Sequence, residues 1–145
     1  MYARQAGSTL QRLARGFPIL ALTGPRQSGK TTLARACFPD KPYVSLENPD
    51  ERDFAEQDPK RFLARFPEGA ILDEVQRLPE LFLILRSLVD ERIRNGEKAG
   101  HFLVLGSASR ELLQQSSESL AGRIAYLELA PFTLDEVDRP RRRAD

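Results

Sequence analysis

Features that mark secreted and membrane-spanning proteins are missing from this sequence. A single cysteine, Cys37, excludes a disulfide within the chain and fits a reducing compartment. The amino-terminal residues are basic but have no apolar segment of the signal-peptide type. The longest apolar runs, such as 81–85, are far too short to span a bilayer. We therefore expect a cytoplasmic protein without membrane contact.

Excess charge and internal repetition are also missing. The 22 basic and 21 acidic residues give a net charge of +1, which offers no support for nucleic acid or an anionic membrane as a partner. No internal repeat or low-complexity tract is present. With 145 residues, 41% hydrophobic and 30% charged, the sequence is typical of one globular domain with a single core.

Apolar runs and helix-forming segments alternate along the chain. Strands are predicted for 19–23, 42–46, 69–74, 101–107 and 124–130. Helices are predicted for 8–15, 29–38, 79–95, from residue 110 onward, and in two pieces over 48–66 with a break at Pro59. The strands are continuous apolar runs, typical of strands that are covered on both faces. This order predicts an α/β sandwich around a mostly parallel sheet.

The turn after the first predicted strand has the pattern G-x-x-x-x-G-K-[ST] of a phosphate-binding loop. Its glycines let successive N–H groups point at phosphate oxygens, and the start of the following helix adds a positive dipole end. Lys30 would neutralise the β- and γ-phosphates, and the Thr31 hydroxyl would ligate Mg²⁺. A chance match is the alternative, and the strand-loop-helix context argues against it. The predicted nucleotide-binding residues are Gly24, Pro25, Arg26, Gln27, Ser28, Gly29, Lys30, Thr31 and Thr32.

Two carboxylates end the third predicted strand, about forty residues after this loop. Asp73 would hold Mg²⁺, directly or through water, and Glu74 would polarise an attacking water. The two are expected to point in different directions because side chains alternate along a strand. A strand that merely ends in acidic loop residues is the alternative. No N-K-x-D guanine-reading motif occurs, so ATP is the expected nucleotide.

Two further candidates follow from their place in a P-loop core with the sheet order 5-1-4-3-2. Ser107 would end the fourth strand, between the loop strand and the acidic strand, where it can sense the γ-phosphate or hold the attacking water. A helix N-cap explains Ser107, or Ser109, equally well. Arg123 precedes the fifth strand and can reach phosphate in a neighbouring subunit, although a solvated surface arginine is the alternative. Roles for Gln76 and Arg77 stay undecided.

Four segments in this order resemble one family: GPRQSGKTTLA, ILDEVQRLPEL, FLVLGSAS and SESLAGRI-YLEL-PF. The chain resembles the prokaryotic AAA+-type ATPases of the ASCE P-loop class, whose core is usually followed by a C-terminal domain of poorly understood function. The resemblance covers about residues 10–137 and implies a three-layer α/β P-loop NTPase core that binds ATP and Mg²⁺. The roles it implies are phosphate binding for Lys30 and Thr31, the Walker B motif for Asp73 and Glu74, first sensor for Ser107 and arginine finger for Arg123.

The sequence departs from that family at its end. Family members continue past PFTLDEV, whereas this sequence ends in DRPRRRAD, which is basic and lacks hydrophobic periodicity. We predict an ATPase core at 1–137, a disordered tail at 138–145, and no helical lid domain. A lid commonly supplies a phosphate contact and part of an oligomer interface, so hydrolysis is expected to be slow.

Two functions from different classes fit these residues. One is an ATPase that hydrolyses ATP to drive a conformational change in a protein partner or a homo-oligomer. The other is a nucleotide-gated binding module with negligible catalysis. A small-molecule phosphotransferase is a third possibility, but no separate acceptor-binding segment is recognisable.

Overall fold

The computed structural model of the chain describes residues 2–25, 29–96, 102–106, 114, 116 and 118–129. The strands are β1 (Ile19–Thr23), β2 (Tyr43–Ser45), β3 (Ile71–Asp73), β4 (Phe102–Gly106) and β5 (Ile124–Glu128). The helices are α1 (Tyr2–Ala14), α2 (Lys30–Cys37), α3 (Pro49–Gln57), α4 (Pro59–Ala64), α5 (Leu81–Arg94) and the 3₁₀ turn η1 (Val75–Arg77). No helix within these ranges has the length and apolar character needed to cross a membrane.

The five strands form one sheet in the order β2-β3-β4-β1-β5. Read from the other edge, this is the predicted order 5-1-4-3-2, which is therefore confirmed. Every strand pair in the sheet is parallel. The carboxyl ends of all strands therefore lie along one edge, where loops from distant parts of the sequence meet.

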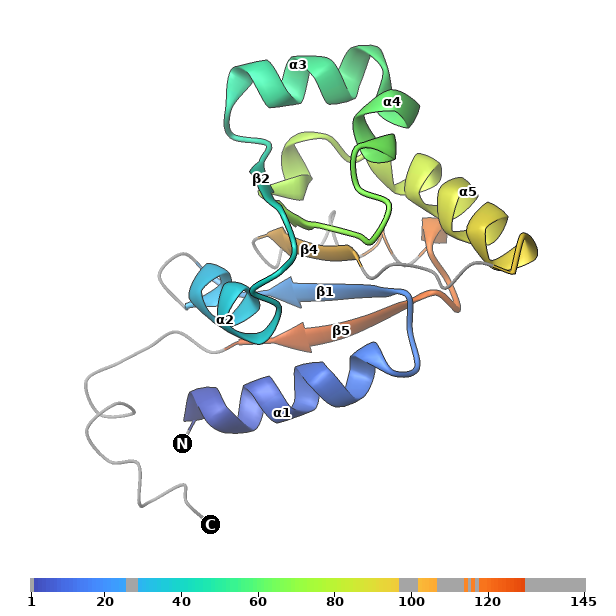
Figure 1. Cartoon of the computed structure of the whole chain (residues 1–145). Coiled ribbons are helices and arrows are strands. Elements are labelled where there is room, and N and C mark those ends of the chain that lie inside the picture. Colours follow the sequence, from blue (N-terminus) through green and yellow to red (C-terminus); the bar gives the residue numbers. More distant parts are fainter. Residues whose placement is uncertain are drawn as a thin grey trace.

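Helices cover both faces of the sheet, giving the predicted three layers (Figure 1). Successive residues of β1 face opposite sides, because side chains alternate along a strand. Ile19 and Ala21 pack with α3, α4 and α5, whereas Leu20 and Leu22 pack with α1 and α2. All five residues of β1 are buried, as are all five of β4. Burial on both faces explains why the strands read as continuous apolar runs.

The first helix is longer than the predicted segment 8–15, because α1 already begins at Tyr2. Gly7 interrupts the apolar periodicity of this helix, so the sequence pattern did not predict its first turns. A Cβ at Gly7 would lie 3.3 Å from the Cys37 sulfur, so the glycine lets α1 pack closely on α2. Burial raises the pKa of the Cys37 thiol, in line with a packing role for this side chain.

The polar segment 48–66 forms two helices, α3 and α4, which divide before Pro59 as predicted. Each helix begins with a side-chain cap followed by proline. Asn48 Oδ1 accepts a hydrogen bond from the Asp50 amide at 2.9 Å, and Asp58 Oδ1 accepts one from the Arg61 amide at 3.2 Å. Most of the helix predicted from residue 110 and the whole predicted tail, 138–145, lie outside the described residues.

Candidate nucleotide-binding site

The loop that follows β1 lies at the carboxyl edge of the sheet, next to the start of α2. Gly29 occupies the left-handed region, with φ 86° and ψ 14°, immediately before α2. This conformation favours glycine and lets the chain turn from the loop into the helix. Arg26, Gln27 and Ser28, which are part of the predicted phosphate loop, lie outside the described residues.

Lys30 opens α2 and is buried. Its Nζ donates to the carbonyl oxygens of Gly24 at 3.0 Å and Pro25 at 3.2 Å. These carbonyls begin the loop, so the ammonium lies inside the turn rather than in solvent. A cation in this position is available to a phosphate group that enters the loop. Thr32, in contrast, is exposed on α2.

Asp73 is the centre of a set of hydrogen bonds at the end of β3. Its side chain is buried, with 6% of the residue exposed. Oδ2 accepts from the Thr31 hydroxyl at 2.9 Å and from the Tyr43 phenol at 2.5 Å. Oδ1 accepts from the backbone amide of Glu74 at 2.9 Å. The structure thus brings together Thr31 and Asp73, whose hydroxyl and carboxylate oxygens are donors of the kind that Mg²⁺ prefers.

Tyr43 is a site residue that sequence reasoning missed. It lies on β2, where it pairs with Ile71 of β3, and its phenol reaches Asp73 two residues further along. Burial and the hydrogen bond to the Asp73 carboxylate raise the pKa of Tyr43 to about 12. The Arg35 guanidinium lies 4.9 Å from the centre of the ring. No local motif signals this contact, because it depends on β2 lying beside β3.

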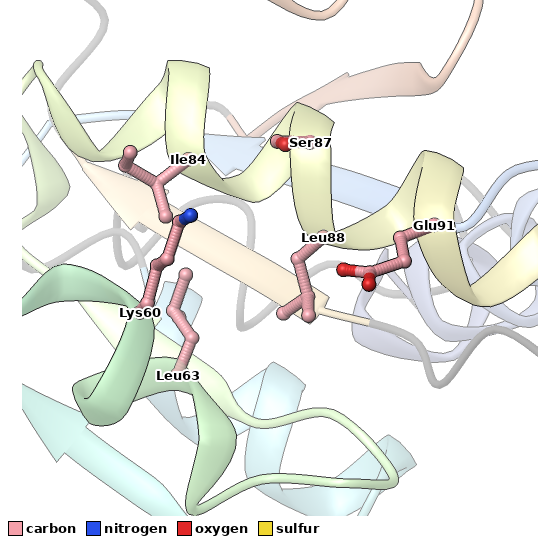
Figure 2. Close-up of a pocket in the computed structure, with 6 residues that line it drawn as sticks. All are labelled: Lys60, Leu63, Ile84, Ser87, Leu88 and Glu91. Atoms are coloured by element: carbon pink, nitrogen blue, oxygen red, sulfur yellow. The ribbon is translucent and has the colours of Figure 1, made fainter.

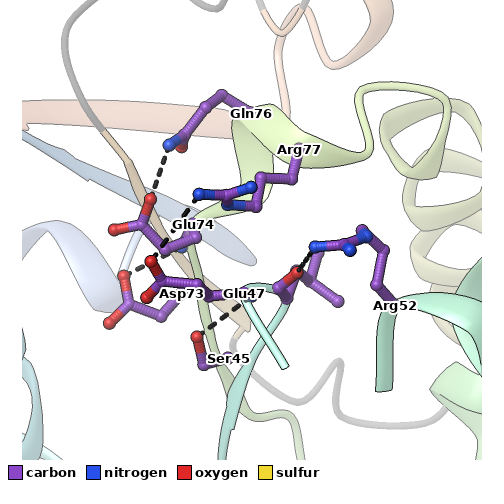
Figure 3. A network of polar contacts seen from close by, with 8 residues as sticks. Ser45, Glu47, Arg52, Asp73, Glu74, Gln76 and Arg77 are labelled. Atoms are coloured by element: carbon purple, nitrogen blue, oxygen red, sulfur yellow. Dashed lines mark hydrogen bonds and ion pairs between the residues drawn. The ribbon is translucent and has the colours of Figure 1, made fainter. Parts of the chain in front are cut away.

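The strand alternation predicted to separate Asp73 from Glu74 does not apply to Glu74. β3 ends at Asp73, and Glu74 takes a left-handed conformation, with φ 59° and ψ 42°, before η1. Gln76 Nε2 donates to Glu74 Oε1 at 2.6 Å (Figure 3). Gln76 Oε1 is buried without a hydrogen-bond partner among the described residues. Arg77 instead pairs with Glu47 at 3.6 Å.

Arg123 lies at the opposite end of the sheet from the phosphate loop. Its carbonyl accepts from the Ile19 amide at the start of β1, whereas the loop follows the last residue of that strand, Thr23. Its Nε and Nη2 donate to the two carboxylate oxygens of Asp90 at 2.7 and 2.9 Å. This pairing lowers the pKa of Asp90 and raises that of Arg123. Arg123 therefore does not join the loop residues of its own chain, and Ser107 lies outside the described residues.

A separate hollow of about 130 Å³ lies between α4 and α5 (Figure 2). The residues that line it are Lys60, Leu63, Ile84, Ser87, Leu88 and Glu91. None of them belongs to the phosphate loop or to the acidic pair. The candidate site is accordingly the carboxyl edge of the sheet and not this hollow.

Comparison with curated proteins gives relatives without an assigned function. Two uncharacterised proteins, from Mycobacterium tuberculosis and Mycobacterium bovis, are each 42% identical to the chain over 137 residues. The match covers 92% of this chain and 30% of each relative. The chain thus spans less than a third of the length of these relatives.

Comparison with solved structures supports the fold. The Orc1 protein of Aeropyrum pernix, solved in complex with DNA, matches 99% of this chain and 48% of its own chain, with a TM-score of 0.57 at 18% identity. A signal-transduction ATPase from Pyrococcus horikoshii with a tetratricopeptide repeat sensor matches 95% of this chain and 25% of its own, with a TM-score of 0.52 at 13% identity. At such identities, the likeness concerns the fold alone.

A family model described as an AAA domain matches residues 16–138, which is most of the chain. This range begins before β1 and includes the phosphate loop, the acidic pair and β5. The sheet order and the loop geometry agree with a nucleotide-binding core of the P-loop NTPase type. From sequence, fold and site together, the chain belongs to the AAA domain family.

Proposed function

We propose that the chain binds ATP and Mg²⁺ at the carboxyl edge of its sheet and hydrolyses ATP slowly. The observation that carries the proposal is the contact between Thr31 and Asp73 beside the buried Lys30. A hydroxyl, a carboxylate and an ammonium, from two segments far apart in the sequence, converge where a phosphate loop would hold a triphosphate. No other cluster among the described residues combines these groups at the end of a parallel strand.

Each residue has a distinct part in the proposed reaction. The Lys30 ammonium would leave the carbonyls of Gly24 and Pro25 and bind the β- and γ-phosphates. Thr31 and Asp73 would hold Mg²⁺, which supplies neutralisation of phosphate charge when it is bound. Glu74 would orient a water for attack on the γ-phosphorus and accept its proton, while the bond to the ADP oxygen breaks.

The test measures ATP binding and phosphate release separately. Lys30→Ala should weaken ATP binding at least tenfold, because it removes the cation from the loop. Lys60→Ala, which removes an exposed lysine from α4, is the matched control and should bind normally. Glu74→Gln should bind ATP normally but lose phosphate release by about a hundredfold or more. Its control is Glu80→Gln, at an exposed position six residues later. Normal ATP binding by Lys30→Ala would refute the proposed site.

A second function is favoured by the hydrogen bond between Gln76 and Glu74. At 2.6 Å, this bond engages the carboxylate that should serve the attacking water. A protein held in this arrangement would bind nucleotide without turning it over and would act as a nucleotide-gated binding module. ATP-dependent partner capture or self-association, with no phosphate release at any protein concentration, would favour this module over the ATPase.

The role of Arg123 is proposed to involve a second copy of the chain. It cannot serve its own loop, because the length of β1 separates the two, about 15 Å at the usual rise per strand residue. An arginine at the amino edge of one copy would instead approach the phosphates bound by another copy. Ser107 keeps its predicted role as a γ-phosphate sensor, to be tested by the phosphate release of Ser107→Ala.

A further inference from the structure

The net charge of +1 conceals an uneven distribution along the chain. Residues 1–39 contain six basic residues and no aspartate or glutamate; the first acidic residue is Asp40. The remaining 106 residues hold 16 basic and 21 acidic residues, so they are net negative. Since α1 and α2, which cover one face of the sheet, both lie within residues 1–39, the layer that these helices form contains basic residues and no acidic one.

The apolar face of α1 packs against α2 and the sheet, so the charged side chain of Arg12 lies on its outer side. Leu10 and Ala14 are buried in the cluster that α1 forms with α2 and the sheet. Arg12, near the end of α1, and Arg15, in the turn that follows it, are both exposed. The apolar face is therefore not available for insertion into a lipid surface, which is the usual use of a basic amphipathic helix.

A groove of about 520 Å³ runs between α1 and the second half of α2. Its lining contains no acidic residue and consists of Gly7, Ser8, Gln11, Arg12, Arg15, Ala36 and Cys37. The Gln11 amide nitrogen donates to the Cys37 carbonyl at 3.1 Å and so ties the two helices together across the groove. The close approach at Gly7 brings the helices near enough to form its floor.

The two arginines of the groove differ from many others in the chain. The side chains of Arg12 and Arg15 make no hydrogen bond or ion pair with a described residue; the two residues are joined only through the backbone, where the Arg15 amide donates to the Arg12 carbonyl at 3.2 Å. Arg65 pairs with Glu51 and Arg123 pairs with Asp90, each at 2.7 Å. Positive side chains that are free of acidic neighbours keep their full attraction for an external anion.

We propose that this groove, with Arg12 and Arg15 on its rim, binds the phosphodiester backbone of nucleic acid without sequence preference. Two exposed guanidiniums three residues apart beside this groove can each bind a phosphate of a nucleic-acid backbone. The contact involves α1 and the second half of α2 and is separate from the nucleotide site, so it does not require ATP.

The test is fluorescence anisotropy of a labelled DNA duplex of about 20 base pairs with the whole chain, without nucleotide, from about 50 to about 200 mM salt. Arg12→Gln/Arg15→Gln should weaken binding about tenfold at low salt and reduce the slope of log affinity against log salt by about 2. Arg12→Lys/Arg15→Lys keeps both charges and should retain most of the binding. A duplex of different sequence should bind equally well.

Lys60→Gln/Arg61→Gln is the matched control, because it removes the same charge from exposed positions on α4. It should leave affinity and salt slope unchanged, and thermal unfolding should show that all variants are folded. Equal losses in the control and the groove variant would overturn the proposal, as would unchanged binding by the groove variant. Equally strong binding to phosphatidylserine vesicles or to polyglutamate would overturn it too, by showing a response to any polyanion.

Discussion

At the scale of single residues, Glu74, for which we propose a catalytic role, has an unfavourable backbone conformation. It is the one non-glycine residue with positive φ in the described part of the chain. A left-handed conformation costs a residue with a Cβ about 1–2 kcal/mol. The surrounding structure maintains it through the following 3₁₀ turn and the hydrogen bond from Gln76. Backbone strain of this kind concentrates at functional sites, which agrees with the proposed role of Glu74.

Replacing Glu74 should reveal this strain directly. Glu74→Gly and Glu74→Ala both remove the carboxylate and its bond to Gln76, but only alanine keeps a Cβ. We expect Glu74→Gly to be more stable than Glu74→Ala by about 1 kcal/mol, despite the greater flexibility of glycine in the unfolded chain. Urea unfolding of the two variants measures the difference. Equal stability, or a more stable alanine variant, would contradict the strain argument.

Tyr43 should make stability depend on pH in the alkaline range. Its pKa is about 12 in the folded protein against 10.0 ordinarily, so the folded state favours the neutral phenol. The resulting stabilisation is complete below about pH 10 and is lost as the pH rises to about 12. Tyr43→Phe has no such group, so its free energy of unfolding should fall less steeply over this range. Parallel curves for the two proteins would show that folding does not raise the pKa of Tyr43.

At the scale of elements, the segment 48–66 shows how local chemistry sets helix boundaries. Proline is favourable in the first turn of a helix and unfavourable in its interior, which explains why Pro59 ends one helix and begins another. Asp58 is the C-cap of α3 and the N-cap of α4. One residue thus ends one helix and begins the next, and both helices pack on the same face of the sheet.

Removing either N-cap should destabilise the protein modestly. Asn48→Ala and Asp58→Ala each leave a helix amide without its side-chain acceptor, at a cost of about 1 kcal/mol in the free energy of unfolding. Glu56→Ala, an exposed change within α3, is the control and should stay within about 0.5 kcal/mol of the parent protein. Chemical denaturation measures all three. A loss in the control as large as that in the cap variants would show that the caps are not responsible.

At the scale of the whole molecule, the functional groups lie on separate surfaces. The proposed nucleotide site is at the carboxyl edge of the sheet, and Arg123 is at the amino edge, held by Asp90 of α5. The basic groove lies on the α1–α2 layer. Because parallel strands place all their carboxyl ends on one side, the two edges cannot meet within one chain. They can meet between copies stacked edge to edge.

This arrangement predicts that turnover depends on assembly. ATP hydrolysis per chain should rise with protein concentration, and Arg123→Ala should abolish that rise, because the site of one copy lacks the arginine of the next. Mixing Arg123→Ala with Glu74→Gln should restore part of the turnover, since an intact Arg123 then faces an intact Glu74. Arg61→Ala is the control for loss of an exposed arginine. Turnover that is independent of concentration, with no recovery on mixing, would exclude a role for Arg123 between copies.

Local patterns were sufficient to predict much of this protein. The alternation of apolar runs and helices predicted an α/β sandwich around a mostly parallel sheet, and the phosphate-loop motif predicted that Lys30 and Thr31 lie at the start of a helix, where α2 begins. Both patterns depend on residues that are neighbours in the sequence, so they can be recognised without knowledge of the fold. The break at Pro59 is of the same kind, because the steric effect of proline acts on adjacent residues.

Tertiary structure decided what depends on contacts between distant segments. Tyr43 reaches Asp73, thirty residues away, only because β2 lies beside β3 in the sheet. The ion pair of Arg123 and Asp90 and the groove between α1 and α2 likewise require packing across the fold. A sequence motif specifies the groups that can bind phosphate, because that chemistry is local. The folded sheet determines which other side chains surround those groups, because side-chain proximity there follows strand order rather than chain order.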